Sequence, residues 1–133
     1  MDAVADTTFL VGLWRRQPWA TGYAALHPSI SLGIPWVVLG EFWHGALRAG
    51  HPAALVGEFL TLGQPLMNPD PVMYARICAE LQDRPVYRAI GQNDLWIASV
   101  ALRESRPLLT RNLRHFGGIP DLRCEVLEGN ERR

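Results

Sequence analysis

Four polar residues occur beside apolar segments at widely separated points of the chain, and together their side chains could carry out metal-dependent chemistry. They are Asp6, Glu41, Asp94 and Asn112. Two carboxylates about 4 Å apart repel by roughly 4 kcal/mol at an effective dielectric of about 20, so three would not all stay ionised without a cation. Oxygen ligands favour Mg²⁺ or Mn²⁺, and no Cys and His pair has the spacing of a zinc site. Water on such a cation can be activated to attack a phosphodiester, which is one reaction that these residue types could support.

Each of these residues also has an ordinary structural explanation. Asp94 precedes eight uncharged residues and could be a helix N-cap or a partner of the helix dipole. Asp6 could form an Asx-turn after a strand. Glu41 could be a solvated helix residue, and Asn112 a loop residue. Asn93 is the stronger N-cap candidate beside Asp94, which would leave the Asp94 side chain available for a cation.

The elements that must position these residues alternate between short apolar strands and helical patterns. We expect strands at 3–6, 29–34, 107–110 and 122–128, with a short strand or extended segment within 65–70. We expect helices from residue 8 onwards, over 35–50, 52–62 and 71–82, and from near Asp94, the last following a loop at 83–93. This alternation predicts βαβ units and a parallel sheet, in which ligands bind beyond the carboxyl ends of the strands.

The composition is that of an ordinary globular protein, 48% hydrophobic and 20% charged, and we expect one domain over residues 1–133. The apolar runs fall short of the about 18 residues of a transmembrane helix, and the acidic N-terminus does not resemble a secretory signal. Cys78 and Cys124 are far apart, which favours buried free thiols in a cytoplasmic protein. The net charge is zero and all 13 basic residues are Arg, so bulk charge gives no sign of nucleic-acid binding, although Arg suits phosphate contacts.

Four segments, in order, resemble the PIN-domain family, and most of all the VapC-type ribonuclease toxins of bacterial toxin–antitoxin pairs. They are "AVADTTFLVGLW", "PWVVLGEFWHGAL", "IGQNDLWIASVAL" and "LLTRNLRHFGGI", and they span residues 3–119. Each motif is weak alone, but their order and the length of the chain make the set specific. The resemblance implies an α/β fold, a three-layer α/β/α sandwich with a central parallel sheet. It also implies an endoribonuclease that depends on Mg²⁺ or Mn²⁺.

The resemblance further implies roles for individual residues. Asp6 and Asp94 would bind the metal. Glu41 would bind it directly or through other groups, and would orient the attacking water. Thr7 and Thr110 would support the site by hydrogen bonds.

The segment around Asn112 departs from the family pattern. Asn112 occupies a catalytic position where many relatives have Asp, so a second metal would be held more weakly. Arg111 and Arg114 flank it, and each could contact an RNA phosphate or simply be solvated. His115 is expected to be a surface residue rather than a catalytic base. His44 lies three residues after Glu41 and could share its helix face, but a role as general base is disfavoured because metal-bound water needs no histidine.

Relatives of this kind bind an antitoxin near the active-site groove and form dimers. The resemblance therefore implies an RNA substrate, a cognate antitoxin protein and a homodimer, with no membrane partner. Trp14 and Trp19, in the polar-punctuated segment "LWRRQPWATGY", are candidates for contact with a partner.

Two other classes of protein compete with the nuclease. A catalytically weak PIN-fold module acting by RNA or partner binding would account for Asn112. The second class is a phosphotransfer or phosphatase domain that uses an Asp after its first strand. A phosphatase of the haloacid-dehalogenase type, one such domain, would have a second acid where Thr8 stands. A response-regulator receiver would usually carry a Lys, and the chain has none.

Overall fold

The structure, a computed structural model, describes residues 1–126, which contain one sheet of five parallel strands in the order β3-β2-β1-β4-β5. The α/β architecture expected from the sequence is therefore confirmed. The strands are β1 (Ala3–Ala5), β2 (Leu32–Pro35), β3 (Gln64–Leu66), β4 (Leu108–Thr110) and β5 (Cys124–Val126). The helices are α1 (Thr7–Trp14), α2 (Pro18–Leu26), α3 (Trp36–Arg48), α4 (Ala53–Phe59), the 3₁₀-helix η1 (Leu60–Leu62), α5 (Pro71–Leu81), α6 (Val86–Ala89), α7 (Gln92–Glu104) and α8 (Leu113–Phe116).

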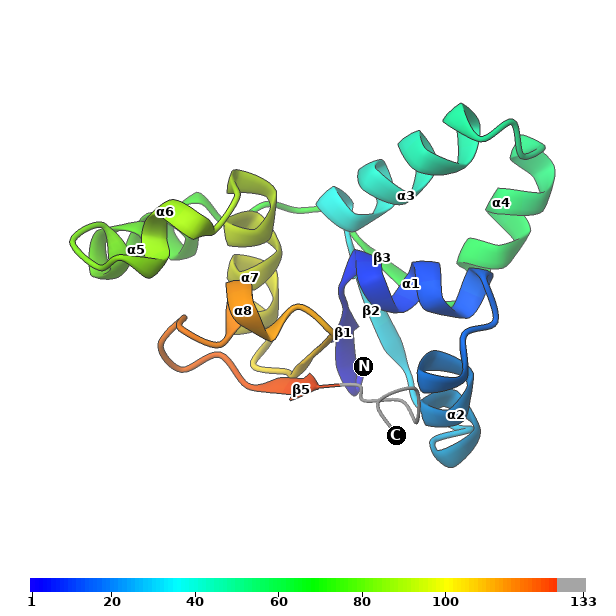
Figure 1. The fold of residues 1–133 in the computed structure, drawn as a ribbon, viewed down its shortest axis with the longest axis horizontal. Coiled ribbons are helices and arrows are strands. Elements are labelled where there is room, and N and C mark those ends of the chain that lie inside the picture. The colour runs from blue at the N-terminus through cyan, green and yellow to red at the C-terminus, as the bar shows by residue number, and fades with distance from the viewer. Residues whose placement is uncertain (127–133) are drawn as a thin grey trace.

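Helices cover both faces of this sheet, so the molecule has three layers (Figure 1). On one side lie α5, α6 and α7, and on the other lie α1 and α2. Helix α7 packs on β1 and α5, while α1 packs on α2 and α3. All five strands run in one direction, so their carboxyl ends meet at one edge of the sheet.

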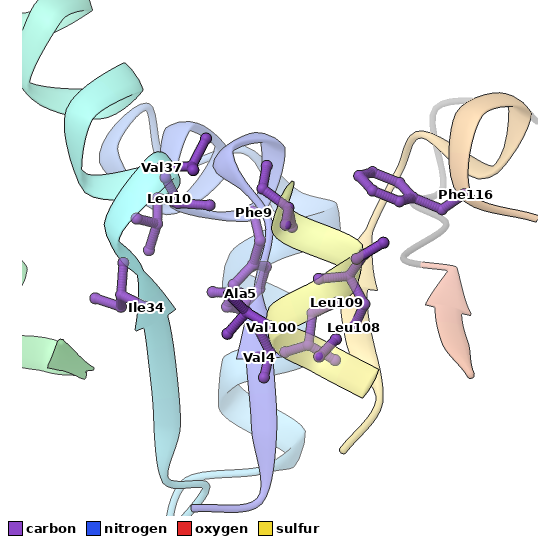
Figure 2. Close-up of a cluster of buried hydrophobic side chains, with 14 of the residues drawn as sticks. Val4, Ala5, Phe9, Leu10, Ile34, Val37, Val100, Leu108, Leu109 and Phe116 are labelled. Carbon is purple, nitrogen blue, oxygen red and sulfur yellow. The ribbon is translucent and has the colours of Figure 1, made fainter. Parts of the chain in front are cut away.

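The central strands are apolar along their whole length. Val4 of β1 and Leu108 and Leu109 of β4 are fully buried, as expected where helices cover both faces of a parallel sheet. Phe9 of α1 and Val100 of α7 pack into the same core (Figure 2). Burying each such side chain stabilises the fold by about 1.5–3 kcal/mol, so the ends of β1 and β4 are held firmly.

Helix α2 is the main element that the sequence does not predict, because residues 13–23 contain charges, Pro and Gly. Pro18 stands at its first position, where proline fits a helix. Trp19 and Ala20 are buried and pack α2 on α1. Gly12 makes this packing possible, since a Cβ there would lie 2.6 Å from the Trp19 ring. Trp19 is only 8% exposed, so the expected partner contact through this side chain is wrong.

The remaining differences concern the ends of elements and short helices. β2 covers 32–35 rather than 29–34, and the predicted helix over 52–62 ends as a 3₁₀ turn, a common way for a helix to finish. The short helix α6 lies in the segment predicted as a loop, and α8 lies between two predicted strands where no helix was predicted. Of the last predicted strand, residues 124–126 are observed, and 127 and 128 lie outside the described residues.

Two expectations about the whole chain can be compared with this fold. Cys78 and Cys124 are free thiols, as expected, but both are half-buried rather than fully buried. Within residues 1–126, no helix is long and apolar enough to cross a membrane.

Candidate active site at the carboxyl edge of the sheet

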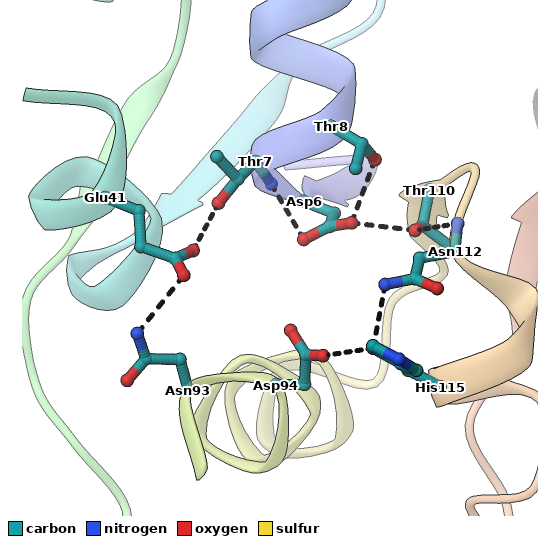
Figure 3. A network of polar contacts seen from close by, with 9 residues as sticks. All are labelled: Asp6, Thr7, Thr8, Glu41, Asn93, Asp94, Thr110, Asn112 and His115. Carbon is teal, nitrogen blue, oxygen red and sulfur yellow. Dashed lines mark hydrogen bonds and ion pairs between the residues drawn. The ribbon is translucent and has the colours of Figure 1, made fainter. Parts of the chain in front are cut away.

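Asp6 lies directly after β1 and is the most enclosed of the three candidate acids, at 3% exposure. It caps helix α1, because its Oδ1 accepts a hydrogen bond from the backbone N–H of Thr7 at 2.8 Å. Its Oδ2 accepts from the hydroxyls of Thr8 at 2.9 Å and Thr110 at 2.7 Å. Asp6 can cap the helix and still serve as a site residue, because three donors fix its carboxylate while it faces the edge of the sheet (Figure 3).

Glu41 reaches the same edge from α3, two turns after β2. The hydroxyl of Thr7 donates to its Oε1 at 2.5 Å, and the amide of Asn93 donates to its Oε2 at 3.1 Å. Glu41 is half-buried. It is therefore not a freely solvated helix residue, because both carboxylate oxygens are held by side chains from other helices.

Asp94 is the third residue of α7 and does not cap it. The N-cap is Gly91, which makes no side-chain capping bond, so the expectation that Asn93 is the N-cap is wrong. The helix starts before Asn93, which turns the Asn93 side chain toward Glu41 instead of toward its own backbone. Asp94 Oδ2 lies 2.7 Å from Nδ1 of His115, and the carboxylate lies opposite Asp6 (Figure 3).

The segment after β4 closes the site. The backbone N–H of Asn112 donates to Thr110 Oγ1 at 2.8 Å, and its amide nitrogen lies 2.8 Å from His115 Nδ1. The guanidinium of Arg111 lies 4.6 Å from the centre of the Trp19 ring, a cation–π contact. Both Arg111 and Arg114 are exposed, and the backbone N–H of Arg111 donates to the Thr8 hydroxyl at 3.3 Å. Asn112 thus contacts its neighbours by hydrogen bonds, and the backbone of Arg111 contacts the Thr8 hydroxyl that supports Asp6.

The carboxylates influence one another through burial and charge. Burial raises the pKa of Asp6, and the nearby Asp94 raises it further, against the opposing effect of its three hydrogen bonds. Burial also raises the pKa of Asp94, as does Glu41, while His115 lowers it. Such a group of acids gains stability from a cation between them.

The side chains of the site could supply some, but not all, of the ligands of a metal ion. Within residues 1–126 there is no group of three or more His, Cys, Asp or Glu side chains arranged to hold a metal ion. The site instead presents two facing carboxylates, Asp6 and Asp94, with Glu41 beside them. Mg²⁺ commonly takes one or two carboxylates and keeps several waters, so these oxygen donors fit it.

A comparison with known protein families decides the relationship. The family model described as "PIN domain" matches residues 3–120. The chain belongs to the PIN-domain family. The resemblance expected from the four sequence segments is therefore confirmed.

Individual PIN-domain relatives are distant but match along their whole length. The chain is 27% identical to ribonuclease VapC1 of Haemophilus influenzae, with 94% of this chain and 97% of the relative covered. Among solved structures, VapBC2 from Rickettsia felis bound to a DNA fragment from its promoter has a TM-score of 0.80 at 23% identity, covering 96% of this chain and 100% of that one. VapBC-1 from nontypeable Haemophilus influenzae has a TM-score of 0.74 at 27% identity, covering 96% and 98%. These structures share the fold of this PIN domain.

Sequence reasoning missed three side chains of the site: Thr8, Asn93 and His115. Thr8 was considered only as a missing acid, yet its hydroxyl contacts Asp6. Asn93 was taken as a cap and His115 as a surface residue, yet they contact Glu41 and Asp94. The signal for Thr8 was its place two residues after the acid, whereas nothing in the sequence pairs His115 with Asp94.

Proposed function

We propose that this PIN domain is a metal-dependent endoribonuclease, the toxin of a type II toxin–antitoxin system. The observation that carries the proposal is the convergence of Asp6, Glu41 and Asp94 from β1, α3 and α7 on one edge of the sheet. The name of its relative, ribonuclease VapC1, supports RNA as the substrate.

Asp6 and Asp94 would hold Mg²⁺ or Mn²⁺. When bound there, the cation makes water more acidic and offsets the negative charge that develops on the phosphate. Glu41 is placed to accept a proton from water, and its two hydrogen bonds keep the carboxylate from rotating. Thr7 and Thr110 hold Glu41 and Asp6 at the angles this requires.

Asn112, Arg111 and Arg114 would act on the substrate side. Asn112 brings a neutral amide, and its place beside His115 favours one resident cation rather than two. Arg111 and Arg114 would contact RNA phosphates, and stacking on Trp19 orders the Arg111 guanidinium before any substrate arrives.

An antitoxin is the second proposed partner, supported by the VapBC complexes among the solved structures with this fold. Trp14 lines a groove of about 410 Å³ with Leu13, Leu55 and Phe59. It also lines an adjoining cavity of about 150 Å³ that reaches Glu41. A protein segment lying in this groove, whose lining also includes Arg16 and Glu58, would lead toward Glu41. The homodimer expected from the sequence stays a prediction.

Cleavage of total cellular RNA tests the nuclease. We expect discrete cleavage by the wild type in Mg²⁺, none in EDTA and none with Asp94→Asn. Asp83→Asn, which alters an exposed acid after α5, is the matched control and should cut like the wild type. Equal cleavage by Asp94→Asn, or in EDTA, would contradict the metal-site assignment. Retained RNA binding with no cleavage of any RNA would favour the binding module.

A further inference from the structure

His115 lies in the last of the four sequence segments but was not predicted as a site residue, yet it lies inside the site. Helix α8 carries it toward the first turn of α7, where its Nδ1 is 2.7 Å from Asp94 Oδ2. The two side chains are 29% and 19% exposed. The next residue, Phe116, is fully buried, so α8 is anchored to the core and cannot easily carry His115 away.

This contact determines what Asp94 offers to a ligand. With Oδ2 bound by the ring, the other oxygen of Asp94 points toward Asp6 (Figure 3). A carboxylate on an unsupported side chain rotates about its last torsion, which has a broad energy minimum. A donor on one oxygen fixes that torsion and leaves the second oxygen aimed across the site.

The ring nitrogen can serve only one neighbour as a proton donor. Nδ1 lies 2.7 Å from Asp94 Oδ2 and 2.8 Å from the amide nitrogen of Asn112. A nitrogen that carries a proton donates and cannot accept, and an ionised carboxylate can only accept. When Asp94 is ionised, His115 therefore donates through Nδ1 to Asp94, and the Asn112 amide nitrogen cannot donate to that same ring nitrogen.

We propose that His115 is a positioning residue for Asp94, holding the carboxylate through Nδ1–H in the orientation that receives the divalent cation. The inference rests on the proposed nuclease function and assigns this side chain a place in the same site. The imidazole does not act as the base in cleavage, because the nitrogen that faces the site is bonded to Asp94. Outer-shell donors of this kind typically change metal affinity by 10–100-fold.

Substitution of His115 by Asn or by Gln distinguishes the roles of its two ring nitrogens. The amide nitrogen of Asn can replace Nδ1, whereas the longer Gln places its amide nearer to Nε2. We expect His115→Leu and His115→Gln to bind Mn²⁺ about 10–100-fold more weakly than the wild type, and His115→Asn to retain most of the affinity. His44→Leu, an exposed histidine on α3, is the matched control and should bind Mn²⁺ like the wild type.

The measurement is isothermal titration of Mn²⁺ into each full-length variant without RNA, with the thermal unfolding midpoint confirming that each is folded. Cleavage rates of an RNA cut by the wild type provide a second readout, in which kcat should follow the same order. Rescue by Gln but not Asn would overturn the proposal, because the role would then belong to Nε2. Tighter Mn²⁺ binding by His115→Leu would also overturn it, because the ring would then compete with the cation.

The outcomes also separate this inference from the function it rests on. If Asp94→Asn abolishes Mn²⁺ binding while all three His115 variants bind like the wild type, only the positioning role fails. If the wild type itself binds no Mn²⁺, both the metal site and the positioning role fail.

Discussion

Asp6 and Asp94 face each other across the site, but the fold holds them in different ways. Asp6 is buried and accepts hydrogen bonds from Thr7, Thr8 and Thr110. Asp94 is half-buried and, within the described residues, accepts one, from His115. A hydrogen bond to a charged group contributes about 1.5–3 kcal/mol, so Asp6 is held redundantly and Asp94 by a single contact. Losing one neighbour should therefore disturb Asp94 more than Asp6.

Removing the charge of Asp6 or of Asp94 should have the largest effect on RNA cleavage, and the effect should be similar for the two acids. We expect Asp6→Asn and Asp94→Asn each to lower kcat/KM for RNA cleavage by more than about 100-fold, because each would lose a direct metal ligand. Steady-state cleavage of one defined RNA measures this, with Asp83→Asn as the control. A variant that kept activity near the wild type would show that its carboxylate is not a ligand.

The hydroxyl groups that donate to Asp6 should contribute different amounts to the free energy of unfolding. Thr110 is fully buried and its hydroxyl also accepts from the Asn112 N–H, so Thr110→Val should lower the free energy of unfolding by about 1.5–3 kcal/mol. Thr8 is half-buried, and Thr8→Val should cost less. Urea unfolding without metal compares them. Equal losses would mean that burial does not distinguish the two donors.

Glu41 can be compared with the two aspartates, because it accepts hydrogen bonds from two side chains, Thr7 and Asn93. Asn93→Ala removes one of them, so we expect a fall in kcat of about tenfold with little change in KM, since Thr7 still holds the other oxygen. Gln92→Ala, at the exposed neighbouring position, is the matched control. An unchanged kcat for Asn93→Ala would show that one hydrogen bond is enough to orient Glu41.

The smallest expected effect is on the pH dependence of stability without metal. The pKa values of Asp6 and Asp94 are raised in the fold, so the folded state holds protons that the unfolded state releases. The free energy of unfolding should therefore fall as pH rises above the ordinary value of 3.8, until both acids are ionised in the fold. The slope should weaken in Asp6→Asn and in saturating Mg²⁺. A slope of the opposite sign would show that hydrogen bonding outweighs burial.

The same comparison explains what could be predicted from the sequence. Asp6 and Thr7 directly follow an apolar strand that is easy to recognise, so their place at the edge of the sheet follows from local pattern, although the contact from Thr8 was missed. The central sheet was predicted for the same reason, because β1, β2 and β4 are short apolar runs between helical segments.

The other half depends on contacts that no local pattern encodes. The start of α7 is set by backbone conformation at Gly91 rather than by a capping side chain, so the orientation of Asn93 could not be deduced. The contact between His115 and Asp94 needs the placement of α8, a single helical turn too short to carry a periodic signal. Helix α2 was missed because tertiary packing at Gly12 and Trp19 stabilises it rather than its propensity.

The position of β1 between β2 and β4 has a consequence for biosynthesis. Asp6 lies near the N-terminus, but one of its hydrogen bonds comes from Thr110, 104 residues later. A chain emerging from the ribosome therefore carries its first acid long before it can form β4 and order that acid. The proposed nuclease would therefore stay inactive during synthesis at least until the residues of β4 had been added.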